Sequence, residues 1–160
     1  MRMAISGLVI TLNEAHNIVD CLRSLRAVCD DIVVVDSGST DGTIALAEAE
    51  GATVIVQKPF LGDGPQRSLG LPRCRHAWVL NLDADERLEP DFIAYVKNTD
   101  LDALGVDLVE TRRRNYIGDR FTPYAGQYPD YVKRLFNRHR ADFTPVVAHT
   151  CVKAATSTKV

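Results

Sequence analysis

The chain has 160 residues, 46% of them hydrophobic, and a formal net charge of −2 at pH 7. This length suits one globular domain with a sizeable core, and the hydrophobic content excludes an intrinsically disordered chain. The longest apolar runs are strand-sized, so no membrane-spanning helix is expected.

Apolar runs of strand length alternate with helical patterns over the first half of the chain. Strands are expected at 5–11, 31–36, 52–57 and 77–82, with helices at 15–27, 43–50 and 66–74 between them. The second strand is continuously apolar from Ile32 to Val35, which is typical of a strand covered on both faces in a parallel sheet. The alternation predicts right-handed crossovers and an α/β fold.

Beyond residue 82 the pattern changes. A helix is expected at 89–99, where Pro90 suits the first turn. Strand-like pieces follow at 108–116 and 131–136, separated by a loop that contains Gly and Pro. No repeat, low-complexity segment or linker divides the sequence, so a single domain is expected.

The basic residues are concentrated in one segment. Residues 112–140 hold eight Arg or Lys residues against Asp119 and Asp130, a net charge of +6. Six Tyr and Phe side chains are interleaved with these charges. Such a surface suits a phosphorylated sugar, an anionic membrane or nucleic acid, and the alternative is a solvated basic face above core aromatics.

Polar residues gather where the predicted parallel strands end. Ligands bind beyond the carboxyl ends of strands in open parallel sheets, because loops and helix N-termini converge there. The first strand is not followed by a Gly-x-Gly turn, and no Gly-x-x-x-x-Gly-Lys-Ser/Thr sequence occurs, which disfavours a dinucleotide-binding Rossmann domain and a P-loop. The residues at the strand ends are Thr11, Asn13 and Glu14, the turn 36–41, Arg67 on a following helix, and Asp83 with Asp85.

Two carboxylates, Asp83 and Asp85, follow the apolar strand that ends at Leu82. Residues i and i+2 of an extended chain project to the same side, so both carboxylates are expected to face one ligand. One or two carboxylates suit Mg²⁺ or Mn²⁺, whose other coordination positions go to diphosphate oxygens. The alternative is an acidic turn that binds no metal.

Four stretches in this order resemble glycosyltransferase family 2, which has the GT-A fold. The stretches are 10–14, 32–42, 66–70 and 79–87. A later stretch, 128–136, is similar to a motif of the lipopolysaccharide-core β-1,4-glucosyltransferases, and the likeness covers about residues 4–149. The resemblance implies a Rossmann-like, mostly parallel sheet flanked by helices.

By this resemblance the protein is an inverting, metal-dependent enzyme that moves a hexose, with glucose as the first choice, from a UDP-sugar to a lipopolysaccharide-core or related glycan acceptor. The cofactor implied is Mg²⁺ or Mn²⁺. The resemblance places Thr11, Asn13, Glu14 and Asp36 around uracil and ribose, Asp41 at the pocket's edge, and Arg67 near the nucleotide. It assigns ribose or metal contact to Asp83, metal contact to Asp85, metal or diphosphate contact to His149, and the role of general base to Asp130.

Five of these assignments have a structural alternative of their own. The alternatives are a turn cap for Asp36, a helix start for Asp41, an exposed helix arginine for Arg67, an ion pair with Lys133 or Arg134 for Asp130, and a strand-end histidine for His149.

Residues 151–160 are small and polar and unlike the family pattern, so a C-terminally truncated GT-A domain is expected. Within one domain, 1–160, residues 1–100 are expected to bind the nucleotide sugar and 101–150 to form the acceptor side. The alternative function is a catalytically impaired nucleotide-sugar-binding fragment or a partner subunit. A nucleic-acid-binding module is disfavoured because it leaves the acidic cluster at the strand ends unexplained.

The cysteines and the N-terminus indicate where the protein works. Four cysteines without a Cys-x-x-Cys pair are expected to be reduced, and the N-terminus lacks the long apolar core of a secretory signal. Both features predict a cytoplasmic protein. The basic segment and the resemblance together suggest peripheral attachment to anionic lipids on the cytoplasmic face of the inner membrane.

Overall fold

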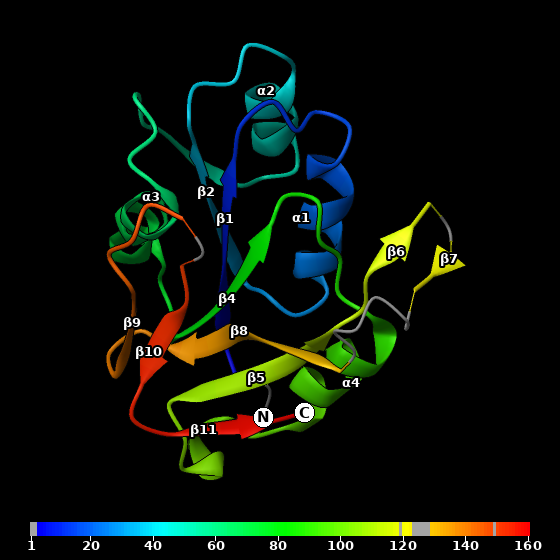
Figure 1. The fold of residues 1–160 in the computed structure, drawn as a ribbon, viewed down its shortest axis with the longest axis vertical. Helices are drawn as coiled ribbons and strands as arrows, with labels where there is room; N and C mark the ends of the chain where they lie inside the picture. The colour runs from blue at the N-terminus through cyan, green and yellow to red at the C-terminus, as the bar shows by residue number, and fades with distance from the viewer. Residues whose placement is uncertain (1–2, 119, 123–128, 149) are drawn as a thin grey trace.

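The computed structural model of the protein describes residues 3–118, 120–122, 129–148 and 150–160. Its centre is a seven-stranded sheet with the strand order β11-β5-β8-β4-β1-β2-β3 (Figure 1). These strands are β1 (Ile5–Thr11), β2 (Asp31–Asp36), β3 (Thr53–Val56), β4 (Trp78–Asp83), β5 (Leu108–Arg113), β8 (Asp130–Asn137) and β11 (Ser157–Lys159). The helices are α1 (Ile18–Arg26), α2 (Thr43–Ala49), α3 (Asp63–Gly70) and α4 (Pro90–Asn98), with 3-10 turns η1 (Leu71–Arg73) and η2 (Asp102–Leu104).

Two small sheets complete the fold. The strands β6 (Tyr116–Ile117) and β7 (Arg120–Phe121) pair with each other and project from the body of the molecule (Figure 1). The strands β9 (Ala141–Phe143) and β10 (Val152–Ala154) form an antiparallel pair beside the main sheet.

The main sheet is mostly parallel. β1 pairs in parallel with β2 and β4, and β2 pairs in parallel with β3. β8 is antiparallel to both β4 and β5, and β11 is parallel to β5. The register places Thr11 opposite Asp36 and Ile10 opposite Asp83, so these strand ends lie side by side at one edge. The predicted fold class is confirmed.

Helices cover both faces of the sheet. α1, α2 and α4 lie on one face, where α1 buries Leu22 and Leu25 in the core that also holds Leu80. α3, η1 and the β9–β10 pair cover the other face, where the rings of Phe136 and Phe143 meet edge-on with centroids 5.2 Å apart. Every residue of β2 is buried, as its continuous apolar run predicts.

Two helices begin three residues away from the predicted start, whereas α4 begins within one residue of it. α1 begins at Ile18 rather than at residue 15, because Asn13 adopts a left-handed conformation (φ 55°) and the chain turns before the helix. In that turn the Asn17 and Ile18 N–H groups both donate to the Glu14 carbonyl oxygen. α3 begins at Asp63 rather than at residue 66.

The segment 151–160 is built into the domain. β10 pairs with β9, and β11 extends the main sheet beside β5. The ammonium group of Lys159 lies 4.7 Å from the centroid of the Tyr131 ring on β8, a cation–π contact. The small polar residues of this segment therefore add two strands to the fold.

No helix among the described residues is long and apolar enough to cross a membrane.

A glycine allows α3 to approach the segment after β9. The N–H groups of Asp63 and Gly64 donate to the Val147 and Val146 carbonyl oxygens, at 2.8 and 3.2 Å. A Cβ atom at Gly64 would lie 2.0 Å from the Thr144 carbonyl oxygen, so a side chain there forces backbone to move.

We expect Gly64→Ala to lower the free energy of unfolding by about 1–3 kcal/mol, because overpacking against backbone is relieved only by displacement. Urea unfolding measures the change. Gly42→Ala is the control, since its added Cβ would meet nothing nearer than 3.7 Å, and it is expected to cost under about 1 kcal/mol. Equal losses in the two variants would contradict the close approach at Gly64.

Candidate functional site

A pocket of about 270 Å³ opens beyond the carboxyl ends of β1, β2 and β4. This is the edge of the sheet at which the sequence predicts a ligand. Its lining residues come from these strand ends and from the loop before α3, and they are Ile10, Thr11, Leu12, Glu14, Ser37, Phe60, Asp83, Ala84 and Asp85.

Asn13 joins two loops at this edge. Its side-chain oxygen accepts a hydrogen bond from the Thr40 N–H at 2.9 Å, and its own N–H donates to the Ser39 hydroxyl oxygen at 2.8 Å. The next N–H group, of Glu14, donates to the Thr43 hydroxyl oxygen at 2.8 Å. Asn13 therefore holds the loop after β1 against the loop after β2, a role that the sequence did not indicate.

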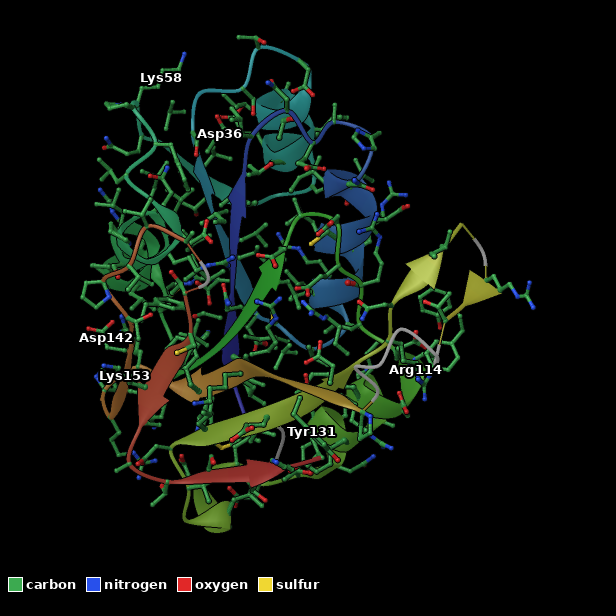
Figure 2. The ribbon with its side chains drawn as sticks, viewed as in Figure 1. Asp36, Lys58, Arg114, Tyr131, Asp142 and Lys153 are labelled. Carbon is green, nitrogen blue, oxygen red and sulfur yellow. The ribbon has the colours of Figure 1, made fainter. Side chains whose placement is uncertain are left out.

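Asp36 is buried, and it lies at the end of β2 (Figure 2). One carboxylate oxygen accepts the N–H groups of Gly38 and Ser39, both at 2.7 Å, and the other accepts the Ser39 hydroxyl at 2.6 Å. The turn cap given as the alternative for Asp36 is thus present in the structure. Its contact with uracil or ribose stays a prediction.

Asp41 holds the start of α2. Its carboxylate accepts the Thr43 hydroxyl and N–H and the Ala15 N–H. The hydrogen bonds from Thr43, followed by that from Ala15, lower the pKa of the Asp41 carboxyl below its ordinary value. The helix start given as the alternative for Asp41 is present, and closure of the pocket by this residue stays a prediction.

Thr11 and Glu14 face the pocket directly. The hydroxyl oxygen of Thr11 is buried and has no hydrogen-bond partner among the residues that the structure describes. Buried hydroxyls are almost always paired, so this one is available to a ligand. One carboxylate oxygen of Glu14 accepts the Asn17 side-chain amide at 2.9 Å.

Arg67 is buried, with 7% of its side chain exposed, and it does not line the pocket. Its guanidinium donates to the side-chain oxygen of Asn81 on β4 and to one carboxylate oxygen of Asp83. The alternative of an exposed helix arginine is wrong. Arg67 instead lies beneath the end of β4, where it fixes Asp83.

Asp83 lies between two arginines. Its second carboxylate oxygen accepts a hydrogen bond from Arg134 on β8 at 3.0 Å. Burial opposes ionisation of Asp83, but the charges of Arg134 and Arg67 outweigh burial and lower the pKa of this carboxyl. Asp83 is therefore an anion whose oxygens are both engaged by the protein.

Asp85 is exposed and borders the pocket. The expectation of an extended chain from Asp83 to Asp85 is wrong, because β4 ends at Asp83 and a turn follows in which the Glu86 N–H donates to the Asp83 carbonyl oxygen at 3.0 Å. The Asp85 carboxylate makes no hydrogen bond or ion pair with the described part of the chain. A hard, unengaged oxygen donor at a pocket edge fits Mg²⁺ or Mn²⁺.

No cluster of three His, Cys, Asp or Glu residues that would hold a metal by itself occurs in the described ranges. His149, the third residue expected to bind the metal, lies outside the described residues.

Asp130 lies at the start of β8 and makes an ion pair with Arg113 of β5, with N–O distances of 2.7 and 3.0 Å. The alternative pairing with Lys133 or Arg134 is wrong, because the register places Asp130 opposite Arg113. Asp130 does not line the pocket, whereas Arg113 lines a second cleft. Its role as general base stays a prediction.

The second cleft, of about 750 Å³, lies between α4, β5 and β8. Asp83 and Asp85 border both the pocket and the cleft, so the end of β4 separates two adjoining spaces. Aromatic and charged side chains alternate on its walls, among them Phe92, Tyr95, Tyr116, Arg112, Arg113, Arg114, Glu89 and Asp91. Figure 2 shows Arg114 on the side of the molecule away from Asp142 and Lys153 of the β9–β10 pair.

The mostly parallel sheet with antiparallel β8 between β4 and β5, and the carboxylates at the end of β4, define a GT-A fold of the nucleotide-diphospho-sugar transferase class. The chain belongs to glycosyl transferase family 2, whose family model matches residues 6–158. This match extends into the segment 151–160, which the sequence predicts to depart from the family pattern.

Relatives and solved structures agree with this family. A glycosyltransferase of Rickettsia felis is 37% identical over 153 residues, which cover 91% of this chain and 52% of the relative. The lipopolysaccharide core biosynthesis glycosyltransferase LpsC of Rhizobium meliloti is 39% identical over 92 residues, 55% of this chain and 34% of LpsC. Three Rickettsia relatives match most of this chain, and the chain spans about half of their length.

Among solved structures, glucosyl-3-phosphoglycerate synthase of Mycobacterium tuberculosis in complex with Mn²⁺, UDP and glucosyl-3-phosphoglycerate is 28% identical, with a TM-score of 0.52, over 68% of this chain and 43% of that chain. TarS of S. aureus is 23% identical, with a TM-score of 0.63, over 79% of this chain and 40% of TarS. The TarS likeness shows the shared fold.

The free hydroxyl of Thr11 allows a test of the pocket. Thr11→Val replaces the hydroxyl with a methyl group of similar size and removes an unpaired buried polar atom. We expect the free energy of unfolding to rise by about 1 kcal/mol, while the affinity for UDP falls about fivefold through loss of one hydrogen bond. Urea unfolding and calorimetry measure the two effects. Unchanged UDP binding would show that this hydroxyl does not contact the ligand.

Proposed function

We propose that the chain forms the donor-binding part of an inverting, metal-dependent glycosyltransferase that moves a hexose, with glucose as the first choice, from a UDP-sugar to a lipopolysaccharide-core or related glycan acceptor. The observation that carries this proposal is the pocket at the ends of β1, β2 and β4, which is lined by a Thr11 hydroxyl and an Asp85 carboxylate that have no partner among the described residues. The Mn²⁺ and UDP bound by the mycobacterial synthase support a UDP-sugar donor and a divalent cation. LpsC supports the acceptor class.

Different residues of the pocket are assigned to different parts of the donor. Thr11 and Glu14 offer a hydroxyl and a carboxylate to the nucleoside, and Asp85 offers a carboxylate to Mg²⁺ or Mn²⁺. When bound, the cation neutralises the negative charge that develops on the departing UDP. Asn13, Asp36 and Asp41 act indirectly in this proposal, because their polar groups hold the loops that frame the pocket.

Transfer also needs a base for the acceptor. The acceptor hydroxyl oxygen forms a bond to the anomeric carbon as the bond from that carbon to UDP breaks, and the hydroxyl proton passes to a carboxylate. We propose that the Asp130 carboxylate accepts this proton. Its ion-pair partner, Arg113, lines the second cleft. The aromatic and charged walls of that cleft suit a glycan acceptor, because sugar rings pack on aromatic faces and their hydroxyls bond to carboxylates and guanidinium groups.

One observation favours the second candidate, a nucleotide-sugar-binding unit or partner subunit without transferase activity. The carboxylate of Asp130 is held by Arg113 and lines neither the pocket nor the cleft. In this case the donor pocket retains its ligand and the base is missing. Donor binding without transfer to any lipopolysaccharide-core acceptor would favour this candidate.

Titration of UDP and UDP-glucose by calorimetry, with Mn²⁺ and with a chelator, tests the donor site. We expect Mn²⁺ to strengthen UDP binding by on the order of tenfold or more, and Asp85→Ala to remove that difference because a metal ligand is lost. Asp142→Ala, which removes an exposed carboxylate on β9 (Figure 2), is expected to bind as the wild type does. A folded wild-type chain that binds neither compound would refute the proposal.

We further infer that the protein works in the cytoplasm, in peripheral contact with the inner membrane. The basic segment supports this, and within it Arg112 is exposed and makes no ion pair with the described residues. Stronger binding to anionic than to neutral liposomes is expected, with about a fivefold loss in Arg112→Ala, since one basic residue near an anionic surface contributes about 1 kcal/mol. Arg23→Ala on α1, where Arg23 pairs with Glu50 at 2.8 Å, is the control. Equal binding to both kinds of liposome would count against membrane contact.

A further inference from the structure

A second arginine, Arg134, fixes the turn that carries the metal-binding carboxylate. Its side chain is 13% exposed. One of its nitrogens lies 3.0 Å from a carboxylate oxygen of Asp83 and 2.5 Å from one of Glu86. Its Nε is buried without a partner among the described residues. A guanidinium is rarely buried unless it is paired, so its place here depends on these two carboxylates.

A β-bulge directs Arg134 toward this turn. Val109 of β5 pairs with Leu135, but the next residue, Glu110, pairs with Lys133, so Arg134 is the extra residue on β8. Arg134 and Leu135 consequently both face the side of the sheet that α1 and α4 cover, where neighbours in a regular strand would face opposite sides. Bulges of this kind aim side chains into functional sites.

Glu86 closes the turn on itself. One of its carboxylate oxygens binds Arg134, and the other accepts the N–H of Asp83 at 2.9 Å. The N–H of Glu86 donates back to the carbonyl oxygen of Asp83 at 3.0 Å. Ala84 and Asp85, which lie between these two residues, are thus held in a turn with a fixed shape.

We propose that Arg134 and Glu86 are positioning residues for cation binding: together with Arg67 they keep Asp83 engaged by the protein and hold the turn in the shape that presents Asp85 to the cation. This inference rests on the proposed function. Arg134 touches neither nucleotide nor cation in this scheme and acts through Asp83 and Glu86. Lysine cannot replace it, because an ammonium group is a compact point charge without the planar fork of a guanidinium.

Binding of Mn²⁺ in the presence of UDP provides the test. Electron paramagnetic resonance counts free Mn²⁺ at saturating UDP against a protein-free reference, because UDP itself binds Mn²⁺, and calorimetry with a chelator measures UDP binding without metal. We expect Arg134→Lys and Arg134→Leu to weaken Mn²⁺ binding by about 10–100-fold, the usual effect of removing a group that orients a metal ligand. Metal-free UDP binding is expected to change by less than about twofold, because Arg134 does not line the donor pocket.

Arg138→Leu is the matched control. Arg138 follows β8 directly and is also half-buried, with an Nε that has no partner among the described residues, and it donates to the Leu71 carbonyl oxygen at 2.8 Å, away from the turn. This variant is expected to keep wild-type affinity for Mn²⁺ and for UDP. If Arg134→Leu does not fold, Mn²⁺ binding by Arg134→Lys and Glu86→Gln is the test, and weaker binding than in the wild type is expected.

The outcomes separate the inference from the proposed function. Wild-type protein that binds no Mn²⁺ in the presence of UDP would overturn both. Wild-type binding with equal Mn²⁺ affinity in the Arg134 variants would overturn the inference alone. A loss of metal-free UDP binding as large as the loss of Mn²⁺ binding would overturn it too, since that result shows a general structural role.

Discussion

The site depends on one chain of alternating charges that runs from Arg67 to Asp83, Arg134 and Glu86. It joins α3, the end of β4 and β8, which are elements on both faces and in the middle of the sheet. Removing one partner of a buried ion pair costs about 3–5 kcal/mol, and the 38% exposure of the Asp83 side chain puts this case toward the lower value. The four charges cancel one another. Asp85 and Glu14 line the pocket without an ion pair to the described residues, and their negative charge favours a cation there.

The loops around the pocket are held in the same way, by polar groups that belong to the loops themselves. The side-chain oxygens of Asn13, Asp36 and Asp41 accept hydrogen bonds from neighbouring N–H and hydroxyl groups. Buried polar groups must be paired, so loops stabilised internally leave few groups for a ligand. Among the described residues that line the pocket, the Thr11 hydroxyl and the Asp85 carboxylate have no partner, and one carboxylate oxygen of Glu14 is also left for a ligand.

The sequence predicts the fold well because its signals are local. Apolar periodicity, turn residues and strand-end carboxylates each act within a few residues, and they locate β1 to β4 and the edge of the sheet where the candidate pocket lies. The local errors are the starts of α1 and α3 and the chain after Asp83, which turns where an extended chain is expected. The contacts that the sequence does not reveal are pairings between distant residues. Arg67 binds Asn81 and Asp83, and Asp130 binds Arg113 instead of a neighbour on its own strand. Strand register decides these contacts, and no pattern within β5 or β8 reveals it.

Arg134 shows most clearly what the periodicity of the sequence does not predict. In a regular β8 its side chain would point away from Leu135, and periodicity alone places it on the face that α3 covers. The bulge opposite Val109 and Glu110 reverses that direction. A bulge costs the sheet one regular pair and is retained where the redirected side chain is needed. The Nε of Arg134 has no partner in the part of the chain that the structure describes, so the burial of this cation depends on the ion pairs that its terminal nitrogen makes with Asp83 and Glu86. Those two residues are the ends of the turn that contains Asp85.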